Sequence, residues 1–95
     1  MSNGKEYIYI LPKCVTDRIV WAVQAMEDDG LPPLWAIEII LAYDEEFCKE
    51  LFELEANGSW LEVTKEFKEW RDGSMSMYKQ YMLLHAFVNG YEVEE

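Results

Sequence analysis

Hydrophobic and polar positions repeat along most of the chain with the period of an α-helix, and the repeats form five blocks. The first block starts at Lys13, and its apolar side carries Val15, Ile19, Ala22, Val23 and Met26. Gly30, Pro32 and Pro33 are typical of a helix end followed by the first turn of a new helix. The second block, 34–43, is apolar almost all round with Glu38 as its only charge, which predicts a helix buried between others.

Short polar signals separate the third and fourth blocks. Asp44 is suited to cap a new helix, because a continuous helix would place its carboxylate on the apolar side. The third helix then has an inner side with Phe47, Cys48, Leu51, Phe52 and Glu55, and an outer side with Glu45, Glu46, Lys49, Glu50 and Glu53. Asn57-Gly58 ends it, and Ser59 with Glu62 has the spacing of a capping box, which predicts that the fourth helix starts there. The apolar stripe of that helix is Trp60, Val63, Phe67 and Trp70.

The fifth block ends at Asn89-Gly90, and its apolar stripe is Met77, Tyr81, Leu84, Val88. Leu83 and Phe87 widen the stripe, so this helix is predicted to pack on two sides. Tyr7–Leu11 suits a short strand, and Tyr91–Val93 can pair with it. Residues 1–5 carry no pattern and are expected to be a loose terminus. The predicted fold is mainly α within the α+β class: about five short helices in a compact bundle, with a two-stranded ribbon formed by the chain termini.

The length of the chain predicts a single domain, 1–95. Because 51% of the residues are hydrophobic, we expect this domain to form a conventional core. Nineteen acidic and eight basic side chains give a net charge of −11. Such a surface lacks the Lys and Arg that neutralise phosphates, which argues against direct binding to nucleic acid or to an anionic membrane. The charge favours a partner protein with a basic surface.

The carboxylates are concentrated between residues 27 and 55, where ten acids accompany a single base, Lys49. One interpretation is a solvated face that keeps the protein soluble. The other is a docking surface for a basic partner. On that hypothesis the partner-binding residues are Glu45, Glu46, Glu50 and Glu53, a second cluster of Glu27, Asp28 and Asp29, and Trp21. Trp21 lies toward the edge of the apolar side of its helix, so it is expected to be exposed.

The residue patterns of common catalytic and metal sites are missing from the chain, so no catalytic residue, metal or cofactor is predicted and an enzyme is not expected. Cys14 and Cys48 occupy apolar positions and are predicted to be reduced core thiols. His85 is the one candidate general base, and a partly buried histidine bonded to a tyrosine or to the backbone is the simpler interpretation. With no secretory signal and no apolar run of about 18 residues, the cytoplasm is the expected location.

Two terminal stretches are similar to a known family. Leu11-Pro12-Lys13-Cys14-Val15-Thr16-Asp17-Arg18-Ile19 has the form LPxxVxxxI. Ala86-Phe87-Val88-Asn89-Gly90-Tyr91-Glu92-Val93-Glu94 has the form A-[WF]-x-x-G-Y-x-V-E. On these residues the chain resembles a family of small proteins, without an established activity, encoded by phages and prophages of Gram-positive bacteria. The resemblance implies a phage or prophage origin and supplies no site residues.

The preferred hypothesis is a phage- or prophage-encoded acidic binding protein that acts in the host cytoplasm. It would inhibit a host nucleic-acid-binding defence protein, of the anti-CRISPR or anti-restriction type, by occupying its basic surface. One alternative is a structural or self-associating phage module in which apolar segments such as Leu34–Tyr43 meet a second copy. Another is a small enzyme centred on His85. The sequence leaves the oligomeric state open.

Overall fold

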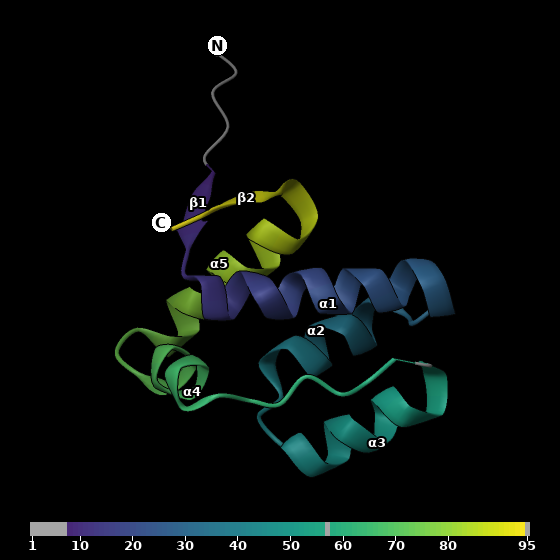
Figure 1. The fold of residues 1–95 in the computed structure, drawn as a ribbon. Coiled ribbons are helices and arrows are strands. Elements are labelled where there is room, and N and C mark those ends of the chain that lie inside the picture. The colour runs from purple at the N-terminus through teal and green to yellow at the C-terminus, as the bar shows by residue number, and fades with distance from the viewer. Residues whose placement is uncertain (1–7, 57, 95) are drawn as a thin grey trace.

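The computed structural model describes residues 8–56 and 58–94, and it confirms the predicted five helices and terminal ribbon (Figure 1). In chain order the elements are β1 (Tyr9–Leu11), α1 (Lys13–Asp29), α2 (Pro33–Leu41), α3 (Glu45–Glu55), α4 (Lys65–Asp72), α5 (Ser76–Asn89) and β2 (Tyr91–Val93). The predicted loose terminus, Tyr7 of the predicted strand, Asn57 and the side chain of Glu55 lie outside the described part of the chain.

Helix α1 is the central element of the fold. Figure 1 shows α2 and α3 on one side of α1, and α5 with the ribbon on the other. The predicted apolar side of α1 buries Val15, Ile19 and Ala22, and α2 contributes Ile39 and Ile40 to the same core. The acidic helix α3 and the helix α5 are therefore separated by the layer that contains α1 and α2.

The predicted helix ends around α2 are confirmed by their hydrogen bonds. Gly30 adopts a left-handed conformation (φ 73°), and its N–H faces the last carbonyls of α1. Asp44 caps α3, since its side chain accepts a hydrogen bond of 3.2 Å from the Phe47 backbone N–H. The break before Asp44 is made by Ala42, which has a left-handed backbone (φ 47°) and is buried.

The segment predicted to begin the fourth helix is extended, so the capping box at Ser59 and Glu62 is wrong. Helix α4 starts at Lys65, and Thr64 is its N-cap, accepting 3.1 Å from the Phe67 N–H. The physical reason lies in the backbone carbonyls of Leu61 and Glu62, which accept hydrogen bonds from a buried arginine of α1. A helix over this segment would direct those carbonyls along its own axis and remove them from that arginine.

Helix α5 buries a different face from the one expected. Its core side is formed by Leu83 and Ala86, with Met82 and Phe87 partly buried beside them. The stripe that was predicted to pack is exposed over its whole length: Met77, Tyr81, Leu84 and Val88. The prediction of packing on two sides is therefore wrong for this chain by itself.

The terminal ribbon is parallel. Tyr9 pairs with Tyr91 and Leu11 with Val93, and the Glu94 N–H extends the ladder with a 2.8 Å bond to the Leu11 carbonyl. Gly90 makes the turn from α5 into β2 with a φ of 99°, a value that favours glycine. Among the described residues, none of the helices has the length and apolar character required to cross a membrane.

Candidate protein-binding face

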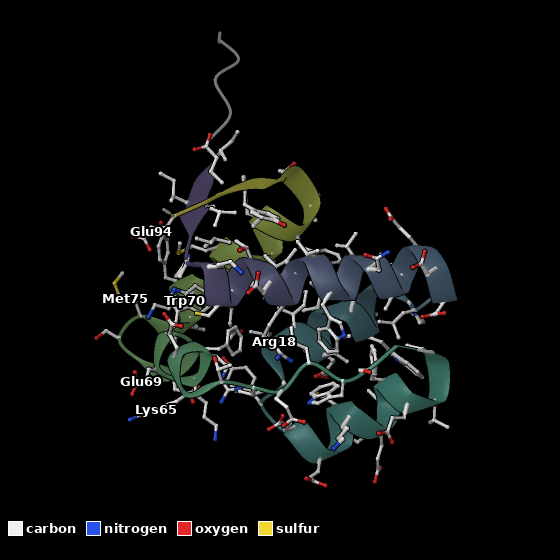
Figure 2. The ribbon with its side chains drawn as sticks, viewed as in Figure 1. Arg18, Lys65, Glu69, Trp70, Met75 and Glu94 are labelled. Carbon is white, nitrogen blue, oxygen red and sulfur yellow. The ribbon has the colours of Figure 1, made fainter. Side chains whose placement is uncertain are left out.

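A buried arginine holds together the elements that carry the acidic helix. Arg18 of α1 is only 2% exposed, and Figure 2 shows it between α1 and the extended segment before α4. Its guanidinium donates to the carbonyls of Ile39 (2.8 Å) and Ile40 (2.9 Å) at the end of α2. It also donates to Leu61 (2.7 Å) and Glu62 (3.2 Å). One side chain thus fastens α1, α2 and the extended segment to each other.

Aromatic rings surround the same guanidinium. Its central carbon lies 5.0 Å from the ring centre of Trp21, 5.5 Å from that of Trp60 and 5.2 Å from that of Phe67. Each of these is a cation–π contact, and such contacts strengthen where water is excluded. Burial lowers the pKa of Arg18 to about 10, so the side chain remains charged at neutral pH.

A second arginine completes the end of α2. Arg71 of α4 donates to the carbonyls of Leu41 (2.7 Å) and Ala42 (2.9 Å) and forms a two-bond ion pair with Asp72. The hydrogen bond with Asp72 raises the pKa of Arg71 and lowers the pKa of the Asp72 carboxyl. The carbonyls at a helix C-terminus lack partners within the helix, and here the two arginines supply them. Sequence reasoning overlooked both arginines.

Glu45 turns inward, in contrast to the outer position predicted for it. One oxygen of its carboxylate accepts 3.0 Å from the Trp60 indole N–H and 3.1 Å from the Val63 backbone N–H. Burial opposes ionisation of this carboxyl, but the two hydrogen bonds and the charge of Arg18 outweigh it and lower the pKa of Glu45. Glu45 therefore fastens α3 to the extended segment and is not available to a partner.

We expect Glu45→Gln to lower the free energy of unfolding by about 1–2 kcal/mol at neutral pH, because charge-assisted hydrogen bonds are lost. A carboxyl whose pKa is lowered in the folded state stabilises the protein at pH values above its ordinary pKa, 4.5. That stabilisation is lost as the pH falls through the lowered pKa of the folded state. The difference between variant and wild type should consequently shrink in acid. Urea unfolding at a series of pH values measures it.

Glu46→Gln is the matched control, since it removes an exposed carboxylate one residue away. Its effect should stay within about 0.5 kcal/mol at neutral pH. A Glu45→Gln variant that matches this control across the pH series would contradict the fastening role.

Trp21 is partly buried, so the expectation that it is exposed is wrong. The centre of its ring lies 4.9 Å from that of the tilted Phe52 ring and 5.1 Å from that of Trp60, which it meets edge-on, and its indole N–H donates 3.1 Å to the Ser59 carbonyl. These contacts place Trp21 in the aromatic cluster that covers Arg18. The contribution of Trp21 is to packing within the chain.

The outward side of α3 carries the remaining predicted carboxylates. Glu46, Glu50 and Glu53 are exposed and follow each other at spacings of four and three residues, which aligns them along the helix. Phe47 and Leu54 are exposed beside them. Phe47 had been assigned to the inner side, and that assignment is wrong. These five residues, Glu46, Phe47, Glu50, Glu53 and Leu54, are called the α3 outer face below.

Within the described part of the chain, no ion pair joins a base to a carboxylate of the α3 outer face, Lys49 of the same helix included. The ion pairs found among residues 8–56 and 58–94 join Lys13 to Asp17, Lys65 to Glu69 and Arg71 to Asp72. Figure 2 shows Lys65 and Glu69 on α4, outside the acidic helix. Two of the chain's bases, Arg18 and Arg71, are buried, and Lys79 donates to the Trp70 carbonyl at 2.6 Å. Those bases bind backbone carbonyls and form no ion pair with Glu46, Glu50 or Glu53.

The second predicted cluster lies at the end of α1. Glu27 and Asp28 are exposed, and Asp29 is partly buried. Asp28 accepts 3.0 Å from the Gln24 amide. Asp28 and Asp29 line a groove of about 300 Å³ that also contacts Trp21 and Phe52, so the structure brings these two close to α3. Glu27 lines a different groove, beside Phe87 and Tyr91, and is not part of that side.

The cysteines and the histidine show no nucleophile–base arrangement. Burial raises the pKa of both the Cys14 and the Cys48 thiol, and nearby carboxylates raise them further, which disfavours the reactive thiolate. Cys48 is buried in the core as predicted, and Cys14 is partly buried. His85 packs edge-on against Tyr9 at 5.1 Å, and its Nδ1 is buried without a hydrogen-bond partner among the described residues. The described residues contain no cluster of His, Cys, Asp and Glu side chains that could hold a metal ion.

Comparison of the chain with protein-family models, with curated proteins and with solved structures gave no match.

Proposed function

We propose that this protein binds another protein through the α3 outer face, and that the partner surface is basic with an apolar depression. The observation that carries the proposal is the combination, on one helix side, of three exposed carboxylates and two exposed large apolar side chains, where the carboxylates form no ion pair with any described residue. Exposed Phe47 and Leu54 add nothing to solubility, so their place beside the carboxylates favours a contact surface. Interfaces commonly combine an apolar anchor with surrounding charges.

The spacing of the carboxylates bears on what the face can imitate. Residues rise about 1.5 Å each along a helix, so Glu46, Glu50 and Glu53 provide roughly one charge per 5 Å. A nucleic-acid strand in a duplex provides about one phosphate per 3.4 Å. The carboxylates thus form a sparser row of charge, with about two charges for every three phosphates of a strand, and Phe47 and Leu54 have no counterpart in that row. The partner surface that fits best is a nucleic-acid-binding channel with an apolar pocket at its edge.

Within that class, the proposed partner is a host nucleic-acid-binding defence protein, and the proposed action is inhibition by occupation of its basic surface. The resemblance of the chain ends to phage and prophage proteins supports this choice, which corresponds to an anti-CRISPR or anti-restriction role in the host cytoplasm. Asp28 is exposed at the end of α1 and lines the same groove as Phe52 of α3, so it extends the negative surface on that side.

We expect the variant Glu46→Lys/Glu50→Lys/Glu53→Lys to lose at least about 100-fold in affinity for a basic nucleic-acid-binding partner, since close charge pairs at interfaces are each worth more than 1 kcal/mol. Host proteins retained on immobilised wild-type protein, and released between about 50 and 500 mM salt, would be identified by mass spectrometry. Inhibition of each retained nuclease would then be titrated with both proteins.

The matched control is Glu66→Lys/Glu92→Lys/Glu94→Lys, which makes the same change in net charge at exposed acids outside α3. It should retain binding within about threefold at physiological salt. Phe47→Ala/Leu54→Ala should weaken binding by about tenfold with little change in salt dependence. Equal losses in the α3 variant and the control would show that net charge alone acts, and would refute the α3 outer face as the site.

A further inference from the structure

Helix α5 is apolar on two opposite sides, and the described residues cover only one of them. Leu83 and Ala86 face the core. On the opposite side Met77 is 72% exposed, Tyr81 69%, Leu84 44% and Val88 75%. A helix that is apolar all round is typical of a position between two packed layers. These four residues, Met77, Tyr81, Leu84 and Val88, are called the α5 outer stripe.

The spacing within the stripe is that of a helix–helix seam. Successive members are four, three and four residues apart, which is the a/d pattern of a heptad repeat. The order is also symmetric about its centre. When two such helices pack antiparallel about a two-fold axis between Tyr81 and Leu84, Met77 meets Val88 of the other copy and Tyr81 meets Leu84. The stripe is therefore complementary to itself, as a two-fold interface requires.

The distribution of charge also favours a second copy of this chain as the partner of the α5 outer stripe. The chain has a net charge of −11, yet residues 73–91 contain no acid and a single lysine, Lys79. Two copies of an acidic protein repel each other over most of their surfaces, and this stretch removes that obstacle. Figure 1 shows that α3 lies on the far side of α1 and α2 from α5, so contact through α5 keeps the two acidic helices apart.

We infer that the α5 outer stripe is the interface of a symmetric, antiparallel homodimer. This goes beyond the proposed function, because it uses a different surface and leaves the α3 outer face exposed on both copies. It also moves self-association away from Leu34–Tyr43, where Ala36, Ile39, Ile40 and Ala42 are buried in the chain's own core.

The size of the stripe sets the expected affinity. Four large apolar side chains at these exposures offer on the order of 300 Å² of apolar area per copy. A standard stable interface buries about 800 Å² per partner. The dimer should therefore be reversible, with a dissociation constant of roughly 1–100 μM.

Sedimentation velocity over about 1–500 μM protein tests the inference, at concentrations that bracket this range. The wild type should pass from monomer to dimer, and raised salt should leave the equilibrium unchanged or favour the dimer. Tyr81→Glu and Leu84→Glu should each weaken dimerisation at least tenfold while leaving the far-UV circular dichroism unchanged, because both side chains are exposed. Leu34→Glu is the matched control, since Leu34 is exposed on α2, and it should dimerise like the wild type.

The antiparallel arrangement has its own test. An equimolar mixture of Met77→Cys and Val88→Cys should form a disulfide-linked heterodimer under a mild thiol oxidant, and each variant alone should form little, with the linkage identified by peptide mapping. A parallel dimer would give the reverse and overturn the arrangement. A wild type that stays monomeric throughout, or a dimer that survives Tyr81→Glu and Leu84→Glu, overturns the interface itself.

Discussion

Replacement of Arg18 by methionine is expected to lower the free energy of unfolding by about 3–5 kcal/mol. The substitution leaves four carbonyls without their donor: those of Ile39 and Ile40 in the interior, and those of Leu61 and Glu62, which are partly buried. Each unsatisfied buried polar group is worth about 1–3 kcal/mol. Since a domain of this size is stable by about 5–15 kcal/mol in total, the variant should be close to unfolding at physiological temperature. Urea unfolding followed by tryptophan fluorescence measures the loss.

Apolar replacement of a buried charge is sometimes neutral or even stabilising, and the partners of the charge decide the outcome. It is tolerated when the partner side chains are replaced at the same time. Here the partners are backbone carbonyls, which no substitution removes, so the loss of hydrogen bonds dominates over the gain in apolar packing. Arg18→Lys should also be destabilising, because one ammonium cannot span α2 and the extended segment.

Lys68→Met is the control for this prediction. Lys68 is an exposed base on α4, and its loss should change the free energy of unfolding by no more than about 0.5 kcal/mol. If Arg18→Met proved as stable as Lys68→Met, the fastening role of Arg18 would be refuted.

The second large effect is expected for Phe67→Ala, which should lower the free energy of unfolding by about 3–5 kcal/mol. Phe67 is fully buried, and its ring lies 5.2 Å from the Arg18 guanidinium and 5.9 Å from that of Arg71. Loss of the ring opens a cavity and also removes a cation–π partner from both arginines. Chemical denaturation again provides the measurement.

Phe47→Ala serves as its control, because the same ring is removed from an exposed position, and the loss should stay below about 1 kcal/mol. In the double variant Arg18→Met/Phe67→Ala the losses should be less than additive, since the two side chains contact each other. Full additivity, or a small loss in Phe67→Ala alone, would argue against an arginine-centred core.

Much of the helical architecture was predictable because local signals decide it. Gly30, Asp44 and Gly90 mark helix ends through backbone conformation or capping, and each does so in the structure. The start of the fourth helix was not predictable in the same way. Trp60 and Val63 have helical spacing from Phe67, yet they lie in an extended segment and are partly buried there. Carbonyls of this segment accept hydrogen bonds from Arg18. A hydrophobic pattern predicts which residues are buried, but it does not predict which backbone carbonyls a distant arginine will bind.

For the candidate site, the density of acidic residues was enough to locate α3. It could not show which side chains of that helix face outward and which face inward. Glu45 and Glu46 are neighbours of one type, but only Glu45 meets the Trp60 indole and the Val63 N–H. The exposure of Phe47 depends on the angle at which α3 meets α2, which no local pattern fixes. Arg18 and Arg71 had a weak signal, since arginine is the base best suited to a buried position with several acceptors.

The parallel ribbon has a consequence for synthesis on the ribosome. Strand β1 is made first among the described elements, and its partner β2 is made last, so nearly the whole described chain separates them. At roughly 5–20 residues per second, β1 waits several seconds without a neighbour. The helices in between can form as they emerge, because their hydrogen bonds are local. Closure of the ribbon is therefore a late event in biogenesis, and until then the nascent protein carries an unpaired strand edge that a second chain could pair with.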